Sequence, residues 1–149
     1  MKKIKICLPS YKDLISLWPD VANWSQDWAF WPIEEVLKSL QSEGCFVALA
    51  TENDQVLGFS FWKYVAGEAE LLFVFVPLGG RGGGIARQLL EFSLAHLKSL
   101  GVTLVFLEVR CSNLAALRLY KALGFNLLST RKQYYKDGED ALVYTRELA

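Results

Sequence analysis

Apolar residues recur along this chain with two different periods, and the two periods predict its strands and helices. Continuous or alternating apolar runs predict strands at residues 4–8, 69–76, 102–110, 126–132 and 141–146. Two more apolar runs, on either side of a polar turn at 52–54, predict a hairpin over 45–65. Apolar residues at helical spacing predict helices at 11–20, 32–44, 84–101 and 112–124. The expected order is therefore β, α, α, β, β, β, α, β, α, β, β.

Two strands and the helix between them predict the centre of the fold. The segments 69–76 and 102–110 are almost continuously apolar, which is typical of strands buried on both faces. The helix that joins them would make a strand–helix–strand crossover. No repeat, low-complexity tract or linker interrupts the chain, so we interpret residues 1–149 as a single mixed α/β domain.

Proline, glycine and short polar residues mark where the helices begin and end. The first helix is expected to stop near Pro19, because proline removes a backbone donor. Gly101 and Gly124 follow the last two helices, in the position that favours a left-handed residue. Ser112 or Asn113 would cap the start of the final helix.

Composition and charge restrict the classes of function. The 149 residues carry a formal net charge of +0, so we expect no nucleic-acid partner. Three distant cysteines (Cys7, Cys45 and Cys111) and one histidine predict neither a disulfide framework nor a metal site. No apolar run is long enough to span a bilayer, and polar residues interrupt any signal-like N-terminal segment. We therefore expect a cytoplasmic protein without a membrane partner.

The stretch "VFVPLGGRGGGIARQLLEF" leads from a buried strand through five glycines into a helix. It is not a nucleoside-triphosphate loop, because Ile85 and Ala86 stand where that motif needs lysine and a hydroxyl. It also lacks the dinucleotide fingerprint G-x-G-x-x-G in any register. The pattern R/Q-x-x-G-x-G/A does fit at 81–86, and there the N–H groups of a helix start bind pyrophosphate. The alternative is a glycine-rich surface turn that binds nothing.

A second group of polar residues follows in "LVFLEVRCSNLAALRLYKALGF". Glu108 lies in an otherwise apolar strand, so it is poorly buried, paired with a cation such as Arg110, or functional. Asn113 could be only a helix cap, and Tyr120 only a core aromatic with its hydroxyl at the rim. Each residue alone has a purely structural interpretation, but the ordered set after a glycine loop favours a functional one.

These motifs resemble the GCN5-related N-acetyltransferases, the GNAT superfamily, and within it the branch that acetylates the N-termini of ribosomal proteins at alanine. The resemblance rests on "RGGGIARQLL", "LEVRCSNLAALRLYKALGF" and "RKQYYKDGEDALVY", and covers about half of the chain, residues 69–144. It implies a central mixed, mostly antiparallel sheet of six to seven strands with about four helices. It also implies acetyl-CoA as co-substrate, no metal, and a protein N-terminus or a small amine as acceptor.

The resemblance implies a role for particular residues of this sequence. Glu108 would be the general base and Tyr120 the general acid in a direct attack of the amine on the thioester. The acceptor slot would include Trp31, Tyr134 and Tyr135. The residues expected to bind acetyl-CoA are Val74, Phe75, Val76, Arg81, Gly82, Gly83, Gly84, Ile85, Ala86, Arg87 and Asn113.

Two departures leave other functions open. Pro77 stands one position earlier than is usual before the family's loop, and the tryptophan-rich segment 18–31 falls where the family builds much of its acceptor site. A GNAT enzyme that acetylates a polyamine, amino acid or antibiotic is therefore an alternative. A catalytically silent acyl-CoA-binding domain is another, with the tryptophans as its interaction patch, although retention of Glu108 and Tyr120 argues against it.

Overall fold

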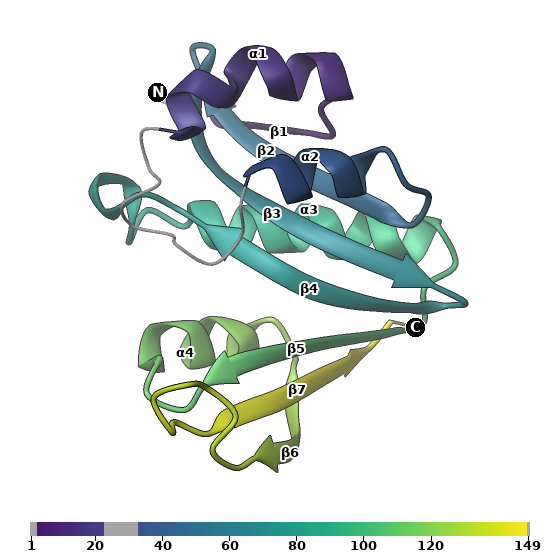
Figure 1. Ribbon diagram of the computed structural model, residues 1–149, viewed down its shortest axis with the longest axis vertical. Coiled ribbons are helices and arrows are strands. Elements are labelled where there is room, and N and C mark those ends of the chain that lie inside the picture. Colours follow the sequence, from purple (N-terminus) through teal and green to yellow (C-terminus); the bar gives the residue numbers. More distant parts are fainter. Residues whose placement is uncertain (1–2, 23–32, 149) are drawn as a thin grey trace. The chain divides into compact units, whose positions relative to one another are not determined.

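The computed structural model describes residues 3–22 and 33–148 (Figure 1). Within these ranges it contains the predicted order of strands and helices. The strands are β1 (Lys5–Cys7), β2 (Cys45–Glu52), β3 (Gln55–Val65), β4 (Glu68–Phe75), β5 (Leu104–Arg110), β6 (Asn126–Arg131) and β7 (Ala141–Glu147). The helices are α1 (Tyr11–Ala22), α2 (Ile33–Leu40), α3 (Ile85–Ser99) and α4 (Leu114–Ala122), with a 3-10 turn, η1, at Leu78–Gly80.

The described strands form one mixed sheet in the order β1-β2-β3-β4-β5-β7-β6. β4 and β5 are parallel, with Glu68–Leu71 opposite Leu104–Leu107, and α3 is the crossover between them. β1 with β2, β2 with β3, β5 with β7, and β6 with β7 are antiparallel. The mixed, mostly antiparallel sheet and the central crossover confirm the predicted fold class.

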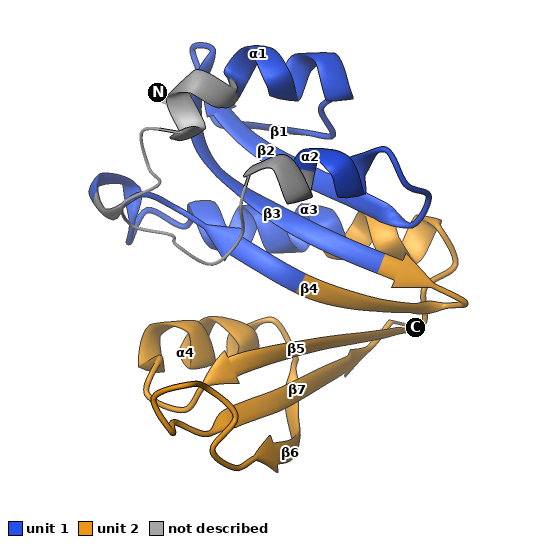
Figure 2. Ribbon diagram, in the orientation of Figure 1, with its two compact units in different colours: residues 1–63, 72–93 blue, residues 64–71, 94–149 orange. Residues whose placement is uncertain are grey.

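The chain forms two compact units, coloured separately in Figure 2. The first comprises residues 1–63 and 72–93, and its core combines the strand residues Val47, Leu49, Phe59, Phe61 and Phe75. A buried hydrogen bond of 3.2 Å between Ser93 Oγ and Ser60 Oγ attaches α3 to β3, and Ser93 Oγ also donates to the Leu89 carbonyl within α3 at 2.7 Å. This first unit carries the glycine-rich loop at the start of α3.

The second unit comprises residues 64–71 and 94–149. Along β5 the buried residues Val105, Leu107 and Val109 alternate with half-buried ones. α4 buries Tyr120, whose ring lies edge-on to Phe125 with the two centroids 5.9 Å apart. The alternation places Glu108 on the less buried face of the strand.

Two local expectations are wrong. α1 continues to Ala22, three residues beyond Pro19, because a proline removes only one rung of the helical hydrogen-bond ladder. β4 is not buried on both faces: Ala69 and Leu71 are buried, whereas Glu68 and Glu70 are exposed. Carboxylates at alternate positions keep that face in water, since an unpaired buried charge is costly. No described helix is long and apolar enough to cross a membrane.

Candidate active site

The glycine-rich segment forms a tight turn between β4 and α3 in the first unit. After β4, the Gly80 N–H donates to the Pro77 carbonyl at 2.9 Å and closes a turn. Gly82 and Gly84 then have φ angles of 84° and 80°, which L-residues with a side chain rarely adopt. A Cβ atom built on either glycine has no heavy atom within 4 Å, so the space above both is open. The backbone of this loop is therefore accessible to a ligand.

The first turn of α3 offers unpaired donors next to that space. In the described part of the chain, no acceptor receives a hydrogen bond from the N–H groups of Gly84, Ile85, Ala86 or Arg87. The first helical hydrogen bond of α3 runs from the Gln88 N–H to the Gly84 carbonyl at 3.0 Å. Gly84 has no side chain to cap them. The N-terminus of a helix also carries about half a positive charge. Unpaired donors, partial charge and open space are the properties of an anion site.

The other predicted cofactor residues of this unit hold the loop in place. Ile85 is buried and packs with Val76 and Leu89, so the start of α3 is anchored in the core. Arg81 turns back onto β4: its Nε donates to the Val76 carbonyl at 2.8 Å, and its guanidinium lies 5.9 Å from the centre of the Phe75 ring. Val74 is half-buried in β4, just before these residues.

Arg87 forms an exposed ion pair with Glu91 at 2.9 Å, one turn further along α3. Exposed pairs of this kind contribute about 0–1 kcal/mol, so Arg87 can exchange this partner for an anion at little cost.

Glu108 lies on β5 in the second unit, and its side chain is 23% exposed. Its Oε1 is 3.3 Å from Nε of Arg131 on β6. This carboxylate, as a hydrogen-bond acceptor and as a negative charge, is the main cause of the raised pKa of the Tyr134 hydroxyl. The alternative that Arg110 pairs with Glu108 is wrong, because Arg110 binds Asp137 and Glu139 instead.

Tyr120 projects from α4 and is only 6% exposed. Burial raises the pKa of its hydroxyl strongly, and the neighbouring Tyr135 raises it further. No described residue hydrogen-bonds to this hydroxyl, which is unusual for a buried polar group. The phenol is therefore protonated at neutral pH and has a proton to donate.

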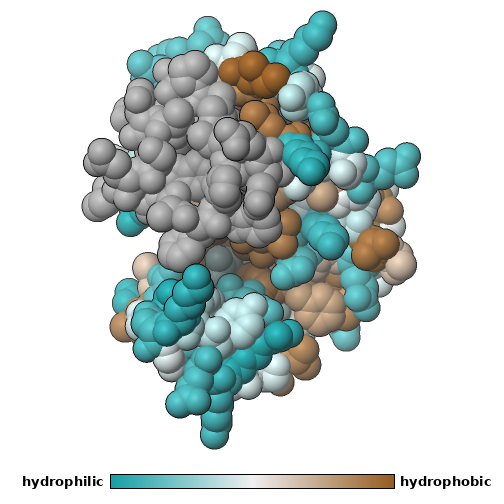
Figure 3. Space-filling model, in the orientation of Figure 1, coloured by the Kyte–Doolittle hydropathy of each residue, from teal (hydrophilic) through white to brown (hydrophobic). Residues whose placement is uncertain are grey.

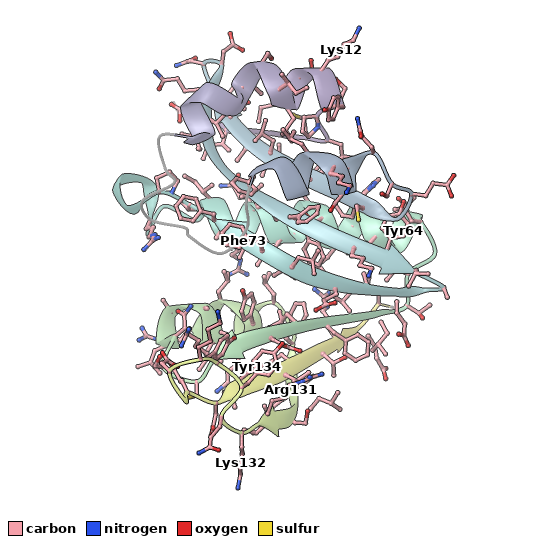
Figure 4. The ribbon with its side chains drawn as sticks, viewed as in Figure 1. Lys12, Tyr64, Phe73, Arg131, Lys132 and Tyr134 are labelled. Atoms are coloured by element: carbon pink, nitrogen blue, oxygen red, sulfur yellow. The ribbon has the colours of Figure 1, made fainter. Side chains whose placement is uncertain are left out.

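Tyr134 and Tyr135 are adjacent, with their rings edge-to-face at 5.2 Å between centroids. Each ring lies beside an arginine: Arg110 is 4.0 Å from the centre of Tyr135, and Arg131 is 5.5 Å from the centre of Tyr134. Figure 4 shows Tyr134 and Arg131 together, with Lys132 pointing away from them. Tyr134 is 49% exposed, and the surface of the β6–β7 end is largely hydrophilic in Figure 3.

Glu139 fixes the loop that carries the two tyrosines. Its Oε1 accepts a hydrogen bond from the Ser112 N–H, and its Oε2 accepts one from Arg110, both at 2.9 Å. The hydrogen bonds from Ser112, and then that from Arg110, lower the pKa of Glu139 to about 2. Arg110 also reaches Asp137 at 2.8 Å. The loop is thereby attached to the end of β5.

The structure gives Asn113 the role of helix cap, since its Oδ1 accepts the Ala116 N–H at 3.2 Å. Contact with a cofactor stays a prediction for this residue. Trp31 lies outside the described residues.

Sequence reasoning missed Arg131 as the partner of Glu108. The two lie 23 positions apart in the chain, and only the register of the sheet brings them together. In the described chain, no group of three or more His, Cys, Asp or Glu residues could hold a metal ion.

The sequence pattern of the Acetyltransferase (GNAT) family matches residues 10–125 of the chain. The chain belongs to the GNAT acetyltransferase family. It is therefore an acyl-transferring enzyme, as the motifs predict. Similar proteins are named ribosomal protein bS18-alanine N-acetyltransferase and N-alpha-acetyltransferase, which is consistent with the branch indicated by "LEVRCSN" and "YYKDGED".

The chain is similar in sequence and in structure to an enzyme of Escherichia coli. The ribosomal protein bS18-alanine N-acetyltransferase of strain K12 is 37% identical over 113 residues, which is 74% of this chain and 76% of that protein. The crystal structure of the ribosomal-protein-S18-alanine N-acetyltransferase from Escherichia coli superposes with a TM-score of 0.85 at 32% identity, over 99% of this chain and 95% of the other. The protein yncA of Salmonella typhimurium, solved with its cofactor acetyl-CoA, shares the fold at 20% identity, with a TM-score of 0.80 over 98% and 94% of the two chains.

Proposed function

We propose that this GNAT enzyme transfers an acetyl group from acetyl-CoA to the N-terminal α-amine of a protein, of the ribosomal-protein alanine type. The observation that carries the proposal is that Arg131 contacts both the Glu108 carboxylate, at 3.3 Å, and the Tyr134 ring, at 5.5 Å from its centre. Arg131 thereby joins the candidate base to a tyrosine of the candidate acceptor slot. The 37% identity to a bS18-alanine N-acetyltransferase supports the same acceptor class.

Glu108 would serve as the general base. An α-amine has a pKa near 7.7–8.0, so at neutral pH most of it is an ammonium that cannot attack a carbonyl carbon. The Glu108 carboxylate, held by Arg131, is suited to take that proton directly or through water. The partial exposure of Glu108 gives an acceptor access to it.

Tyr120 would serve as the general acid. When bound, acetyl-CoA supplies an acetyl thioester and, after transfer, a thiolate leaving group. The Tyr120 hydroxyl keeps its proton because burial raises its pKa, and no described side chain or carbonyl competes for that proton. The proton on its Oη is therefore available to a leaving sulfur. No covalent bond between enzyme and acetyl group is needed.

The glycine-rich loop fits the pyrophosphate of acetyl-CoA. The N–H groups of Gly84 to Arg87 would donate to phosphate oxygens, and Gly82 and Gly84 leave room for the backbone to approach them. Arg81 and Arg87 would add positive charge. By the family resemblance, the backbone of Val74 to Val76 would bind the pantetheine arm as a neighbouring strand would, and Asn113 would contact the cofactor.

The acceptor slot would be formed by Tyr134 and Tyr135, with Trp31 as a further member. The two tyrosines are held at fixed angles by Arg110, Arg131 and Glu139, so their rings offer a rigid surface to an extended N-terminus. A peptide bound there would present its amine to the Glu108 carboxylate.

A thiol-release assay with four acceptors tests this proposal. The purified protein would receive acetyl-CoA with a peptide that begins with free alanine, the same peptide with a blocked N-terminus, a blocked peptide that contains lysine, or spermine. We expect release of CoA thiol with the free alanine peptide only. Release with spermine alone would replace the proposal with a small-amine acetyltransferase. Binding of acetyl-CoA without release would favour a silent acyl-CoA-binding domain.

A further inference from the structure

Arg131 occupies a position from which it reaches both the candidate base and a candidate acceptor tyrosine. It ends β6 opposite Ala141 of β7, and Ala141 in turn lies opposite Arg110 of β5. Glu108 lies two residues before Arg110 on β5, so the Arg131 side chain spans two strands diagonally. Its Nε is 3.3 Å from Oε1 of Glu108, and this contact fixes one oxygen of the carboxylate.

Tyr134 closes a three-membered cluster. The Arg131 guanidinium lies over the Tyr134 ring, 5.5 Å from its centre, and the Glu108 carboxylate raises the pKa of the Tyr134 hydroxyl. Arg131 therefore contacts both of the other members. The cation constrains the carboxylate and the phenol together, whereas an ion pair alone would constrain only one of them.

The other charged groups near Glu108 cannot replace Arg131. Arg110, two residues along β5, is bound by Asp137 and Glu139 at 2.8 and 2.9 Å. On β4, Glu70 is negative and acts on the same Tyr134 hydroxyl as Glu108 does. Tyr135, on the loop, is neutral at physiological pH, because burial raises the pKa of its hydroxyl. Among the described residues, Arg131 is thus the cation that directly faces the carboxylate.

We propose that Arg131 is a positioning residue, which aims the Glu108 carboxylate at the acceptor amine. The fork-shaped guanidinium fixes the orientation of the carboxylate in a way that lysine cannot reproduce. The Arg131 side chain is 55% exposed, so water screens the pair and the electrostatic part is modest. This inference rests on the proposed role of Glu108 as the base.

The experiment compares the wild type with Arg131→Gln, Arg131→Lys and the control Lys132→Gln. Lys132 is the adjacent cation, exposed and pointing away from the cluster, so its removal changes the net charge equally. The kcat and KM with the alanine peptide would be measured separately for each protein at one pH, and circular dichroism would confirm that each variant is folded.

We expect Arg131→Gln to lower kcat with the alanine peptide by roughly tenfold, since misplacement of a reacting group by 1 Å can cost about 10²-fold. Arg131→Lys should not restore kcat, because lysine keeps the charge but lacks the planar fork. Lys132→Gln should leave kcat unchanged. The ionisation of the amine is the same in all samples, so differences report on the enzyme.

Two results would overturn the inference. The first is an unchanged kcat in a folded Arg131→Gln protein, which would make the ion pair only structural. The second is full recovery of kcat by Arg131→Lys. A failure of the proposed function would be recognised by other results. These are full activity in Glu108→Gln, or no acetyl transfer by the wild type to the alanine peptide.

Discussion

Replacement of Gly84 by alanine should weaken the binding of acetyl-CoA far more than it weakens the fold. Gly84 has a φ of 80°, and a Cβ there meets no protein atom within 4 Å. The methyl group would therefore project into the open space beside the unpaired N–H groups of α3. If that space receives the pyrophosphate, the methyl group pushes the phosphate oxygens away from their donors.

The two effects of this substitution can be calculated separately. A hydrogen bond to a charged group contributes about 1.5–3 kcal/mol, so the loss of one such bond should raise the Kd for acetyl-CoA by about 10- to 150-fold. The left-handed backbone costs an L-residue about 1–2 kcal/mol, but this strain is present with and without ligand. It should lower the Tm by roughly 2–8 °C and leave the Kd unchanged.

Isothermal titration calorimetry with acetyl-CoA measures the Kd, and thermal unfolding measures the Tm. Gly79→Ala is the matched control, because Gly79 lies in the same loop, does not have a positive φ, and would place its Cβ away from all heavy atoms. We expect its Kd to stay within about twofold of the wild type, since substitutions away from special features usually change little. A folded Gly84→Ala protein with the wild-type Kd would refute the assignment of this loop.

Three other substitutions test separate parts of the structure. Tyr120→Phe should lower kcat by about 10²- to 10⁴-fold at an unchanged Kd for acetyl-CoA, and unchanged turnover would exclude Tyr120 as the acid. Gly58→Ala should lower the Tm by several degrees, because its Cβ would lie 2.7 Å from the Phe75 carbonyl oxygen; an unaltered Tm would contradict that close approach. With its pKa at about 2 against 4.5, Glu139 should stabilise the fold above pH 4.5 and lose this contribution as the pH falls towards 2. Urea unfolding of Glu139→Gln should therefore show a weaker pH dependence in that window, and an identical dependence would argue against it.

Features that depend on local sequence could be predicted here. Periodicity gave the order of the strands and helices, and the glycines after α3 and α4 do have positive φ angles, 85° at Gly101 and 86° at Gly124. Asn113, one of the two expected caps, does cap α4. These features follow from the backbone preferences of a few neighbouring residues, so a single sequence is enough to infer them.

The partners of Glu108 depend on contacts between distant segments and could not be inferred in this way. Arg110 is two residues from Glu108 in the sequence, yet it pairs with Asp137 and Glu139 of the β6–β7 loop. Arg131 replaces it because β7 lies between β5 and β6, in a register that composition does not encode. The burial of β4 was misjudged for a similar reason, since apolar content alone does not reveal which face neighbouring segments cover.

The most direct test of the central claim is to locate the acetyl group on the product. A peptide that begins with alanine and contains one internal lysine would be incubated with acetyl-CoA and the wild type or Glu108→Gln, and then sequenced by tandem mass spectrometry. The proposed function predicts acetyl on the α-nitrogen alone with the wild type. With Glu108→Gln it predicts a much slower reaction at neutral pH that recovers partly as the pH rises and the amine loses its proton unaided. Acetyl on the lysine, or equal rates for the two proteins at every pH, would contradict the account.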